Sequence, residues 1–219
     1  MAAKAQKPVN DDNAELSALI NGEPLTGTAR EAFFETLFSR RSVAPKRLGA
    51  PGPSQDELEL IIAAGLTAPD HGPLRPWRFL RVPDERRAHL ANLFAEEKRL
   101  YQPEATEAEV EAERARAFNA PTLIALLVDI TENHPKVPVH EQYISLGAAA
   151  ANMLLACHAM GYGAMMTSGR KIDTPTLQQA FCKKPSERLI GFLSIGTAMR
   201  PPKTRVPVTR EDHFEDWTG

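Results

Sequence analysis

The sequence predicts a mixed fold, α+β or α/β, in which helices flank one sheet. Two apolar runs bounded by turn signals, at 123–128 and 189–195, are typical of buried strands. Two longer segments, at 54–66 and 141–161, carry apolar residues at helical spacing. Because such elements alternate along a chain of 219 residues, we expect them to share one sizeable core.

The N-terminal part is predicted to hold an arm and two helices. Residues 1–29 are rich in Asn, Asp, Gly, Pro and Thr, and we expect an extension there, followed by a single domain over 30–219. Between 29 and 40 the apolar residues recur at helical spacing, which predicts an amphipathic helix. Ser54 and Glu57 form a capping box that begins the second helix, which ends just before Pro69.

A rigid loop at 68–77 follows, and it carries His71, Arg75 and Trp77. Its three prolines fix the backbone and remove donors, so neither a helix nor a central strand passes through it. Such a loop holds polar groups well for a ligand, although a plain connection between a helix and a strand is equally consistent with its composition.

The middle of the chain continues with a strand at 78–82 and a helix for which Asp84 is the expected cap. The charge-rich run at 104–116 is interpreted as a solvated helix face without chemistry. The segment at 141–161 is interpreted as a core helix rather than a membrane span, because polar residues and many alanines interrupt it.

The C-terminal part is predicted to hold two strands, a short helix and a tail. One strand lies within 161–169, and the helix begins at Thr174 and Pro175. The last strand ends at Gly196, and a tail starts at about residue 198.

Composition and motifs exclude several classes of function. A net charge of -2 offers no basic field for nucleic acid or a membrane surface, and the two cysteines form no zinc or disulfide pattern, so we expect no metal. No signal peptide is recognisable, which leaves a cytoplasmic location as the expectation. The patterns H-E-x-x-H and G-x-S-x-G and the phosphate-loop motif are absent, and Gly161 and Gly163 open a strand rather than a helix, which disfavours a dinucleotide fingerprint.

An anion site without a glycine loop remains a candidate. Arg40 and Arg41 stand where a helix gives way to a loop and offer guanidinium groups to a phosphate, and Ser42 adds a hydroxyl. The alternative is that the two arginines only offset the helix dipole at its C-terminal end.

Several short motifs together resemble the FMN-dependent nitroreductase family, in particular its branch of small bacterial NAD(P)H nitroreductases. The similarity covers roughly residues 30–199, in order and at compatible spacings. The motifs are Arg40-Arg41-Ser42, Ala68-Pro-Asp-His71 with Pro76-Trp77, the cluster from Glu132 to Gln142, Gly161-Tyr-Gly163 with Ser168-Gly169, and Gly191 to Thr197.

This resemblance implies an α+β fold with a central antiparallel or mixed sheet, built as an intertwined homodimer with one FMN at each subunit interface. It assigns Arg40, Arg41 and Ser42 to the phosphate and ribityl chain, and His71 to the flavin from that same subunit. The turn matching Met166, Thr167 and Ser168 is expected to approach the ring from the other subunit.

The sequence departs from this pattern at two expected flavin contacts. Thr67 stands where relatives carry an arginine, and Met166 where they carry an aromatic residue. The resemblance also implies a ping-pong reaction in which NAD(P)H, as co-substrate, passes hydride to flavin N5 and a nitroaromatic, a quinone or a similar small molecule is then reduced. The cofactor supplies the reactive chemistry, so no catalytic side chain is assigned.

Two other functions on the same scaffold remain open at this point. One is a protein that holds FMN for storage or sensing without turnover, which the absence of an evident acid or base suggests. The other is a different flavin reaction, such as dehalogenation. For His71, an ordinary surface hydrogen bond is also an alternative to a flavin contact.

Overall fold

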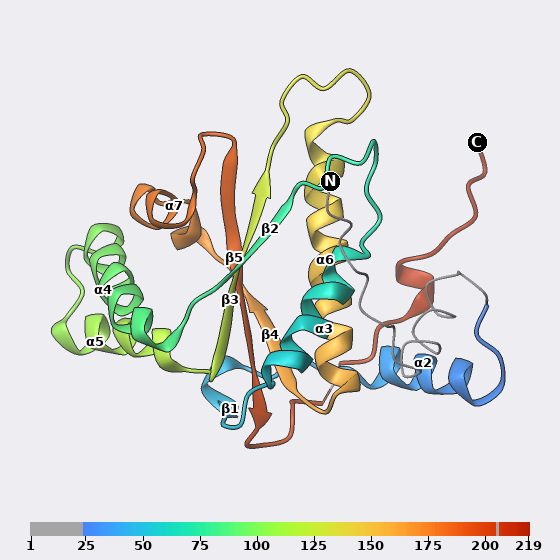
Figure 1. Ribbon diagram of the computed structural model, residues 1–219, viewed down its shortest axis with the longest axis horizontal. Coiled ribbons are helices and arrows are strands. Elements are labelled where there is room, and N and C mark those ends of the chain that lie inside the picture. Colours follow the sequence, from blue (N-terminus) through green and yellow to red (C-terminus); the bar gives the residue numbers. More distant parts are fainter. Residues whose placement is uncertain (1–23, 205) are drawn as a thin grey trace, which may run out of the picture. The chain divides into compact units, whose positions relative to one another are not determined.

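The computed structural model describes residues 24–204 and 206–219, without the side chains of residues 170 and 171 (Figure 1). Contacts within the chain divide it into two units, 1–39 and 40–219. The described part of the first unit contains α2 (Gly27–Ser39), the amphipathic helix expected at 29–40. Its aromatic side chains are exposed, and the ring of Phe34 lies 5.5 Å from that of Phe33 and 5.7 Å from that of Phe38. Most of the arm predicted at 1–29 lies outside the described residues, and its boundary stays a prediction.

The second unit is organised around an antiparallel sheet (Figure 1). The strand order is β1-β5-β3-β2, and β4 also pairs with β5, antiparallel in every case. This arrangement confirms the predicted α+β class with a central antiparallel sheet. The strands are β1 (Leu48–Gly49), β2 (Trp77–Arg81), β3 (Thr122–Asp129), β4 (Gly163–Thr167) and β5 (Glu187–Ala198).

Helices cover both faces of this sheet, as Figure 1 shows: α3 and α6 on one face, α4, α5 and α7 on the other. The helices are α3 (Gln55–Leu66), α4 (Asp84–Tyr101), α5 (Glu107–Ala115), α6 (Val139–Ala159) and α7 (Pro175–Phe181). The described residues also contain short 3-10 helices, of which three lie between the other elements and the last lies in the C-terminal tail: η1 (Pro45–Arg47), η2 (Arg116–Phe118), η3 (Arg170–Asp173) and η4 (Arg210–Asp212).

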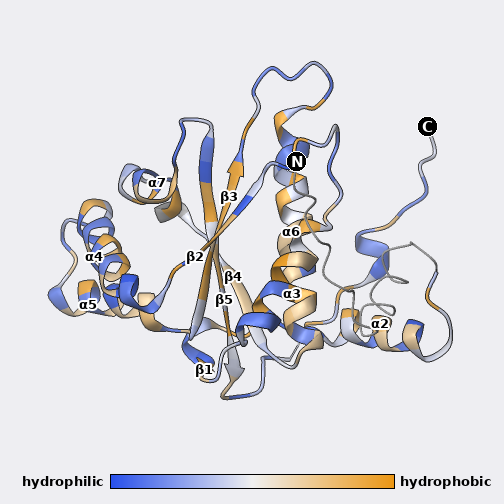
Figure 2. Cartoon of the chain, in the orientation of Figure 1, coloured by the Kyte–Doolittle hydropathy of each residue, from blue (hydrophilic) through white to orange (hydrophobic). Residues whose placement is uncertain are grey.

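The two faces of β3 carry two separate cores, because successive side chains of a strand point to opposite faces. Ile124, Leu126 and Val128 pack with α3 and α6, whereas the alternate residues Leu123 and Leu127 pack with α4 and α7. Seven of the eight residues of β3 are buried, which confirms the strand predicted to be covered on both faces, and the strand is largely apolar in Figure 2.

The long helix α6 lies in the core as predicted, and Met153 and Cys157 are fully buried in it. Burial raises the pKa of the Cys157 thiol to about 12, so this cysteine is a packing residue. Among the residues that the structure describes, no helix is long and apolar enough to cross a membrane.

Two predictions of local structure hold and two are wrong. Ser54 and Glu57 form the expected capping box, and Pro175 occupies the first turn of α7. Asp84 is not a cap: Pro83 takes that position, and Asp84 lies in the first turn of α4. Gly196 does not end the last strand. A side chain at Gly196 would collide with Pro121 and the carbonyl of Gly49, so close packing inside a 12-residue strand is what requires glycine there.

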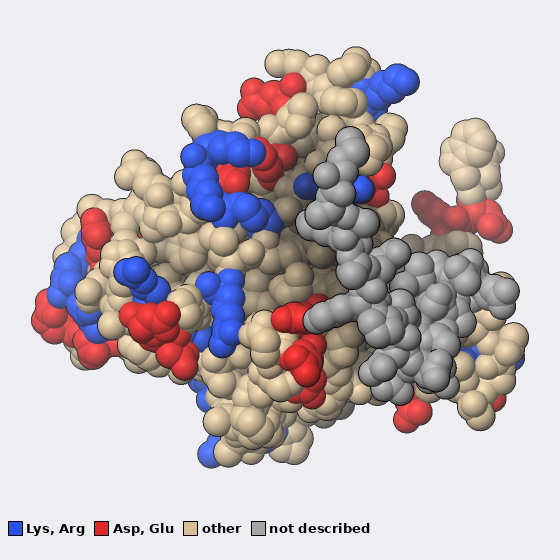
Figure 3. Space-filling view, viewed as in Figure 1, with Lys and Arg blue, Asp and Glu red and all other residues tan. Residues whose placement is uncertain are grey.

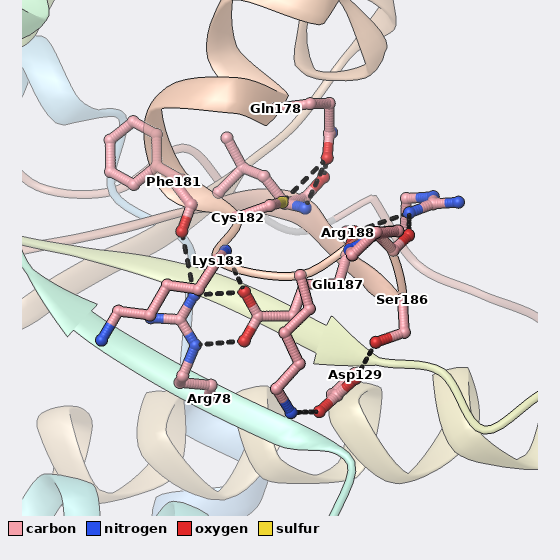
Figure 4. A network of polar contacts seen from close by, with 12 residues as sticks. Arg78, Asp129, Gln178, Phe181, Cys182, Lys183, Ser186, Glu187 and Arg188 are labelled. Carbon is pink, nitrogen blue, oxygen red and sulfur yellow. Dashed lines mark hydrogen bonds and ion pairs between the residues drawn. The ribbon is translucent and has the colours of Figure 1, made fainter.

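A polar network ties β2 to the start of β5 and to the residues after α7 (Figure 4). The guanidinium group of Arg78 donates from Nε and Nη2 to the carboxylate of Glu187 at 2.8 and 2.7 Å, and Nη2 also donates to the carbonyl of Phe181 at 2.9 Å. Lys184 and Ser186 bind Asp129, which lowers the pKa of that carboxyl group. Nη1 of Arg78 is buried without a hydrogen-bond partner, but the other side-chain groups of this network bind one another, and we assign the network to the fold.

Charged side chains on the face shown in Figure 3 are interspersed, with lysine and arginine beside aspartate and glutamate. This face therefore carries no broad field of a single sign.

Candidate functional site

The predicted anion motif lies beside the start of β4. Ser42 pairs in parallel with Ala164, and the amide of Val43 donates to the carbonyl of Ala164 at 3.1 Å. Because the pairing is parallel, the chain after Ser42 runs in the same direction as β4. It therefore carries Pro45 and Lys46 toward the C-terminal end of that strand.

Arg40 and Arg41 lie near the C-terminal end of α6. The pKa of His158, in the last turn of this helix, is lowered by burial first and then by the positive charges of Arg40 and Arg41. The guanidinium Nη1 of Arg41 donates to the carbonyl of Arg40 at 3.0 Å. The Nη1 atom of Arg40 is buried without a hydrogen-bond partner, so a charged donor there is left for a ligand.

A cavity of about 390 Å³ opens at the C-terminal end of β4, on the α4 and α7 face of the sheet. This volume lies within the range of small-molecule sites in proteins. Its apolar wall includes Phe94, Leu123 and Phe192, and its polar lining consists of Lys46, Glu97, Glu113, Arg116, Asn119, Thr167, Ser168 and Ser194. It therefore combines the mostly apolar surface and the few polar groups that bind a small ligand.

The turn after β4 is held in place by β5. The hydroxyl groups of Thr167 and Ser168 donate to the carbonyls of Phe192 and Ile190 at 3.3 and 2.6 Å. A Cβ atom at Gly191 would lie only 2.5 Å from the carbonyl oxygen of Thr167, so this close approach requires glycine. Strand β5 thus fixes the conformation of the turn that lines the cavity, although no residue of β5 was predicted from the sequence to contact the ligand.

The carboxyl groups of Glu97 and Glu113 line the same cavity. Glu97 is 0% exposed, and neither of its oxygens has a hydrogen-bond partner. Glu113 is ion-paired with Arg116 at 3.2 Å. The interpretation of 104–116 as a purely solvated face is therefore wrong for Glu113 and Val110, which are buried, although most of α5 and the side chain of Arg116 are exposed.

The proline loop, residues 68–77, lies elsewhere and is bonded to α6. Nδ1 of His71 lies 2.7 Å from the carboxylate of Glu141, at the start of that helix. The hydroxyl of Ser145 donates to the carbonyl of Pro69 at 2.7 Å, and the side chain of Asn152 donates to the hydroxyl of Thr67, just before the loop, at 3.3 Å. Within the loop, the amide of Arg75 donates to Asp70 at 2.6 Å, with Arg75 at a φ of 49°.

The structure therefore brings the predicted site residues together in two places. Arg40, Arg41 and Ser42 lie at the start of β4, and Thr167 and Ser168 lie at its end. His71 is far from Arg40 and Arg41, because its partner Glu141 and the arginine neighbour His158 stand near opposite ends of α6, about 25 Å apart at the rise of a helix. Thr67, bonded to Asn152, lies between these ends.

Met166 presents its side chain to the other side of the sheet. It packs against the core formed with α3 and α6, while its neighbour Thr167 lines the cavity. The carbonyl of Ala164 points to the outer edge of β4, where it accepts from Val43. Because backbone groups repeat every two residues along a strand, the amide and carbonyl of Met166 point to that edge as well. Within one chain, the backbone of Met166 can therefore contact a ligand at the site, whereas its side chain lies on the other face of the sheet.

Lys46, Glu97 and Arg116 line the cavity but were not predicted from the sequence. Helical spacing held a signal for Glu97, since it follows Leu90 and Phe94 at seven and three positions and so shares their inward face. In α5, Glu113 follows the buried Val110 by three positions and so shares its inward face. In the part of the chain that the structure describes, no three His, Cys, Asp or Glu side chains gather as a possible metal site.

Comparison with known proteins gives a consistent result. A model of the nitroreductase family matches residues 37–197. The protein YdjA of Escherichia coli strain K12, which carries the provisional name NAD(P)H nitroreductase, is 32% identical over 174 residues, or 80% of this chain and 92% of YdjA.

Solved structures share the fold, among them the following two. A nitroreductase-like family protein from Bacillus cereus superposes with a TM-score of 0.73 at 20% identity, over 90% of this chain and all of that protein. A nitroreductase, also provisionally named, from Desulfovibrio desulfuricans was solved in complex with FMN. It superposes with a TM-score of 0.64 at 23% identity, over 85% of this chain and 98% of that protein.

Proposed function

The chain belongs to the nitroreductase family, and on that premise we propose that it is an FMN-dependent oxidoreductase that uses NAD(P)H to reduce a small acceptor. The acceptor class is a nitroaromatic compound, a quinone or a similar molecule, and the two half-reactions follow a ping-pong order. The observation that carries the proposal is the cavity at the end of β4 together with two buried, unpartnered polar groups, Arg40 and Glu97.

The residues present fit FMN at both of its ends. A buried guanidinium donor without a partner suits a phosphate, and Arg40 supplies one beside Arg41 and Ser42. A cavity with aromatic walls and several hydrogen-bonding groups suits the flavin ring system, which is flat, apolar on its faces and polar along one edge. The path from Ser42 to Lys46 along β4 connects these two places.

Within one subunit, Arg40, Arg41 and Ser42 would hold the phosphate and ribityl chain. Lys46 and Arg116 would place positive charge at the polar edge of the ring, and the backbone from Met166 through Thr167 to Ser168 would orient it. When bound, FMN supplies the hydride-transfer chemistry, and the protein contributes binding, orientation and a surface shielded from water.

We further propose that the protein functions as a homodimer and that Thr67 and His71 act toward the flavin of the partner subunit. The distance along α6 separates His71 from the phosphate motif of its own chain. Large apolar side chains are exposed on α3 and α6, among them Leu66, Tyr143 and Ile144, the last with 65% of its surface exposed. Such a surface is typical of a subunit interface.

The absorbance spectrum of the purified protein tests the flavin assignment. We expect bound FMN, and we expect NADH or NADPH to bleach it under anaerobic conditions. A protein that neither retains nor binds FMN would overturn the proposal. Bound FMN that both nicotinamides leave oxidised would indicate a storage or sensing protein instead.

A further inference from the structure

Glu97 is the buried group that the fold itself leaves unexplained. It lies on α4, is 0% exposed, and lines the cavity at the end of β4. Both of its oxygens lack a hydrogen-bond partner. The preceding residue on the same helix, Glu96, is exposed and places a charged group in contact with solvent. The buried carboxyl group of Glu97 has no such role in the hydration of α4.

A buried carboxyl group without a donor opposes folding. Desolvation of a polar group is costly unless a hydrogen bond replaces the lost water, and the cost is greater for a charged group. A glutamine or an apolar side chain at this position would reduce that cost. Glu97 is therefore expected to lower the stability of the ligand-free protein, and a ligand that donates to it would recover the loss.

The rest of the cavity lining defines what such a ligand must look like. Lys46 and Arg116 contribute cationic donors, and the turn at Ser168 and Gly169 contributes backbone. Of the two carboxyl groups that the described residues contribute to the lining, Glu113 is paired with Arg116, which leaves Glu97 as an acceptor without a donor. The complementary edge presents an N–H flanked by two carbonyl oxygens, as in a cyclic imide. The flavin ring carries such an edge, with N3–H between O2 and O4.

We propose that Glu97 accepts a hydrogen bond from the imide N–H of the flavin, and that it thereby makes the protein hold oxidised flavin more tightly relative to reduced flavin. This inference rests on the proposed FMN function. A carboxylate at the polar edge opposes the negative charge that two-electron reduction places at N1, whereas Lys46 and Arg116 favour it. Glu97 is a positioning and tuning residue, and no proton or hydride is transferred to or from it.

The test uses the full-length protein stripped of flavin, with FMN and 3-methyl-FMN, in which a methyl group replaces the N3 hydrogen. We expect the wild type to bind FMN at least tenfold more tightly than 3-methyl-FMN. In Glu97→Ala this preference falls below threefold. In Glu97→Gln the midpoint potential of bound FMN should rise, because reduced flavin then binds more tightly relative to oxidised flavin. A tenfold change in the ratio of the two dissociation constants corresponds to about 30 mV for a two-electron couple.

A second readout separates this role from a structural one. The flavin-free Glu97→Gln protein should melt at or above the temperature of the flavin-free wild type, because the substitution removes a buried unpartnered carboxyl group. The matched control is Glu96→Gln on the same helix, which should leave melting temperature, FMN preference and potential unchanged.

The outcomes distinguish this inference from the proposed function. A wild type that binds no FMN overturns both. A wild type that binds FMN and 3-methyl-FMN equally, or a Glu97→Gln protein whose flavin properties match those of Glu96→Gln, overturns only the role of Glu97. A drop in the melting temperature of flavin-free Glu97→Gln would show that the fold itself needs this carboxyl group, and would overturn it as well.

Discussion

The proline loop and the cavity at the end of β4 differ in how their polar groups are satisfied. In the loop, His71, Asp70 and the carbonyl of Pro69 all have partners within the same chain. In the cavity both oxygens of Glu97 are buried without partners, and so is Nη1 of Arg40 in the motif at the start of β4. The loop keeps its shape without a ligand, whereas the cavity and the motif beside it leave hydrogen-bonding capacity that only another molecule can fill.

This difference indicates which region carries binding energy and which provides shape. An unsatisfied buried donor or acceptor costs about 1–3 kcal/mol, and a ligand that pairs with it recovers that amount. The side chains of His71 and Glu141, which are 2.7 Å apart, are 53% and 36% exposed, and an exposed polar contact of this kind contributes less than about 1 kcal/mol. Substitutions at Arg40 or Glu97 should therefore affect flavin binding more than substitutions in the loop.

The largest effect is expected from Arg40→Ala. The variant loses the buried charged donor that we assign to the phosphate, so the dissociation constant of FMN should rise by about 100-fold, or about 3 kcal/mol. Arg41→Ala should weaken binding by a smaller factor, because its Nη1 is already engaged by a backbone carbonyl. Fluorescence titration of FMN measures both constants.

Riboflavin, which lacks the phosphate, is the control ligand for these two variants. The control variant is Arg86→Ala, which also removes an arginine but on the exposed side of α4. Riboflavin binding should change by less than about threefold in all three proteins. Unchanged FMN affinity in both Arg40→Ala and Arg41→Ala would remove the phosphate assignment.

The next effect concerns the turn that shapes the cavity. In Gly191→Ala the new methyl group would collide with the carbonyl of Thr167, so the turn must move. We expect the free energy of unfolding to fall by about 1–3 kcal/mol, as for other overpacked sites, together with weaker FMN binding. Ser168→Ala removes only the hydroxyl bond to Ile190 and should cost about 1 kcal/mol. Chemical denaturation of the flavin-free proteins gives both values, and equal stabilities would contradict the constraint that we assign to Gly191.

A third experiment separates the two regions by subunit. If His71 acts across a dimer, a hybrid of one Arg40→Ala subunit and one His71→Ala subunit contains one unaltered site and one doubly altered site. Differently tagged subunits allow this hybrid to be purified. We expect half of its sites to bind FMN with wild-type affinity, whereas each parent homodimer binds more weakly, by about tenfold for His71→Ala. Two weakened sites, one with the affinity of each parent homodimer and neither with wild-type affinity, would show that His71 and Arg40 serve the same subunit, as the family resemblance implies, and a monomeric protein would exclude the shared site.

The sequence predicted those parts of the molecule that depend on local pattern. The buried strand β3 and the core helix α6 follow from apolar runs and helical spacing, and the capping box of Ser54 follows from two residues three positions apart. The two-residue strand β1 carries no such pattern. It forms because Leu48 and Gly49 lie against the end of β5, a contact between distant parts of the chain.

The candidate site was predictable only in part, for a related reason. Arg40, Arg41 and Ser42 form a short motif, which the sequence displays directly. Glu97 gains its character from burial, which depends on how α4 packs against the sheet and α5. A charged residue within the polar sequence of α4 gives no sign that both of its oxygens lack partners.

The smallest expected effect is a change in the pKa of His158, which reports on the phosphate site without altering it. Burial and the charges of Arg40 and Arg41 hold this pKa below its ordinary value of 6.5. In the flavin-free protein the folded state therefore binds fewer protons than the unfolded state just below pH 6.5. The stability is fully present above that pH and declines as the pH falls toward the folded pKa.

A bound phosphate would offset the two arginine charges and raise this pKa, while the contribution of burial would remain. Because the coupling is reciprocal, FMN binding should tighten as the pH falls through this range. NMR titration of the histidine signals, with His158→Gln to assign the resonance, should show an upward shift of less than about one unit with FMN and none with riboflavin. An equal shift of the His158 pKa with FMN and with riboflavin would mean that the ring, rather than the phosphate, changes this pKa. In that case His158 would not report on phosphate bound at Arg40 and Arg41.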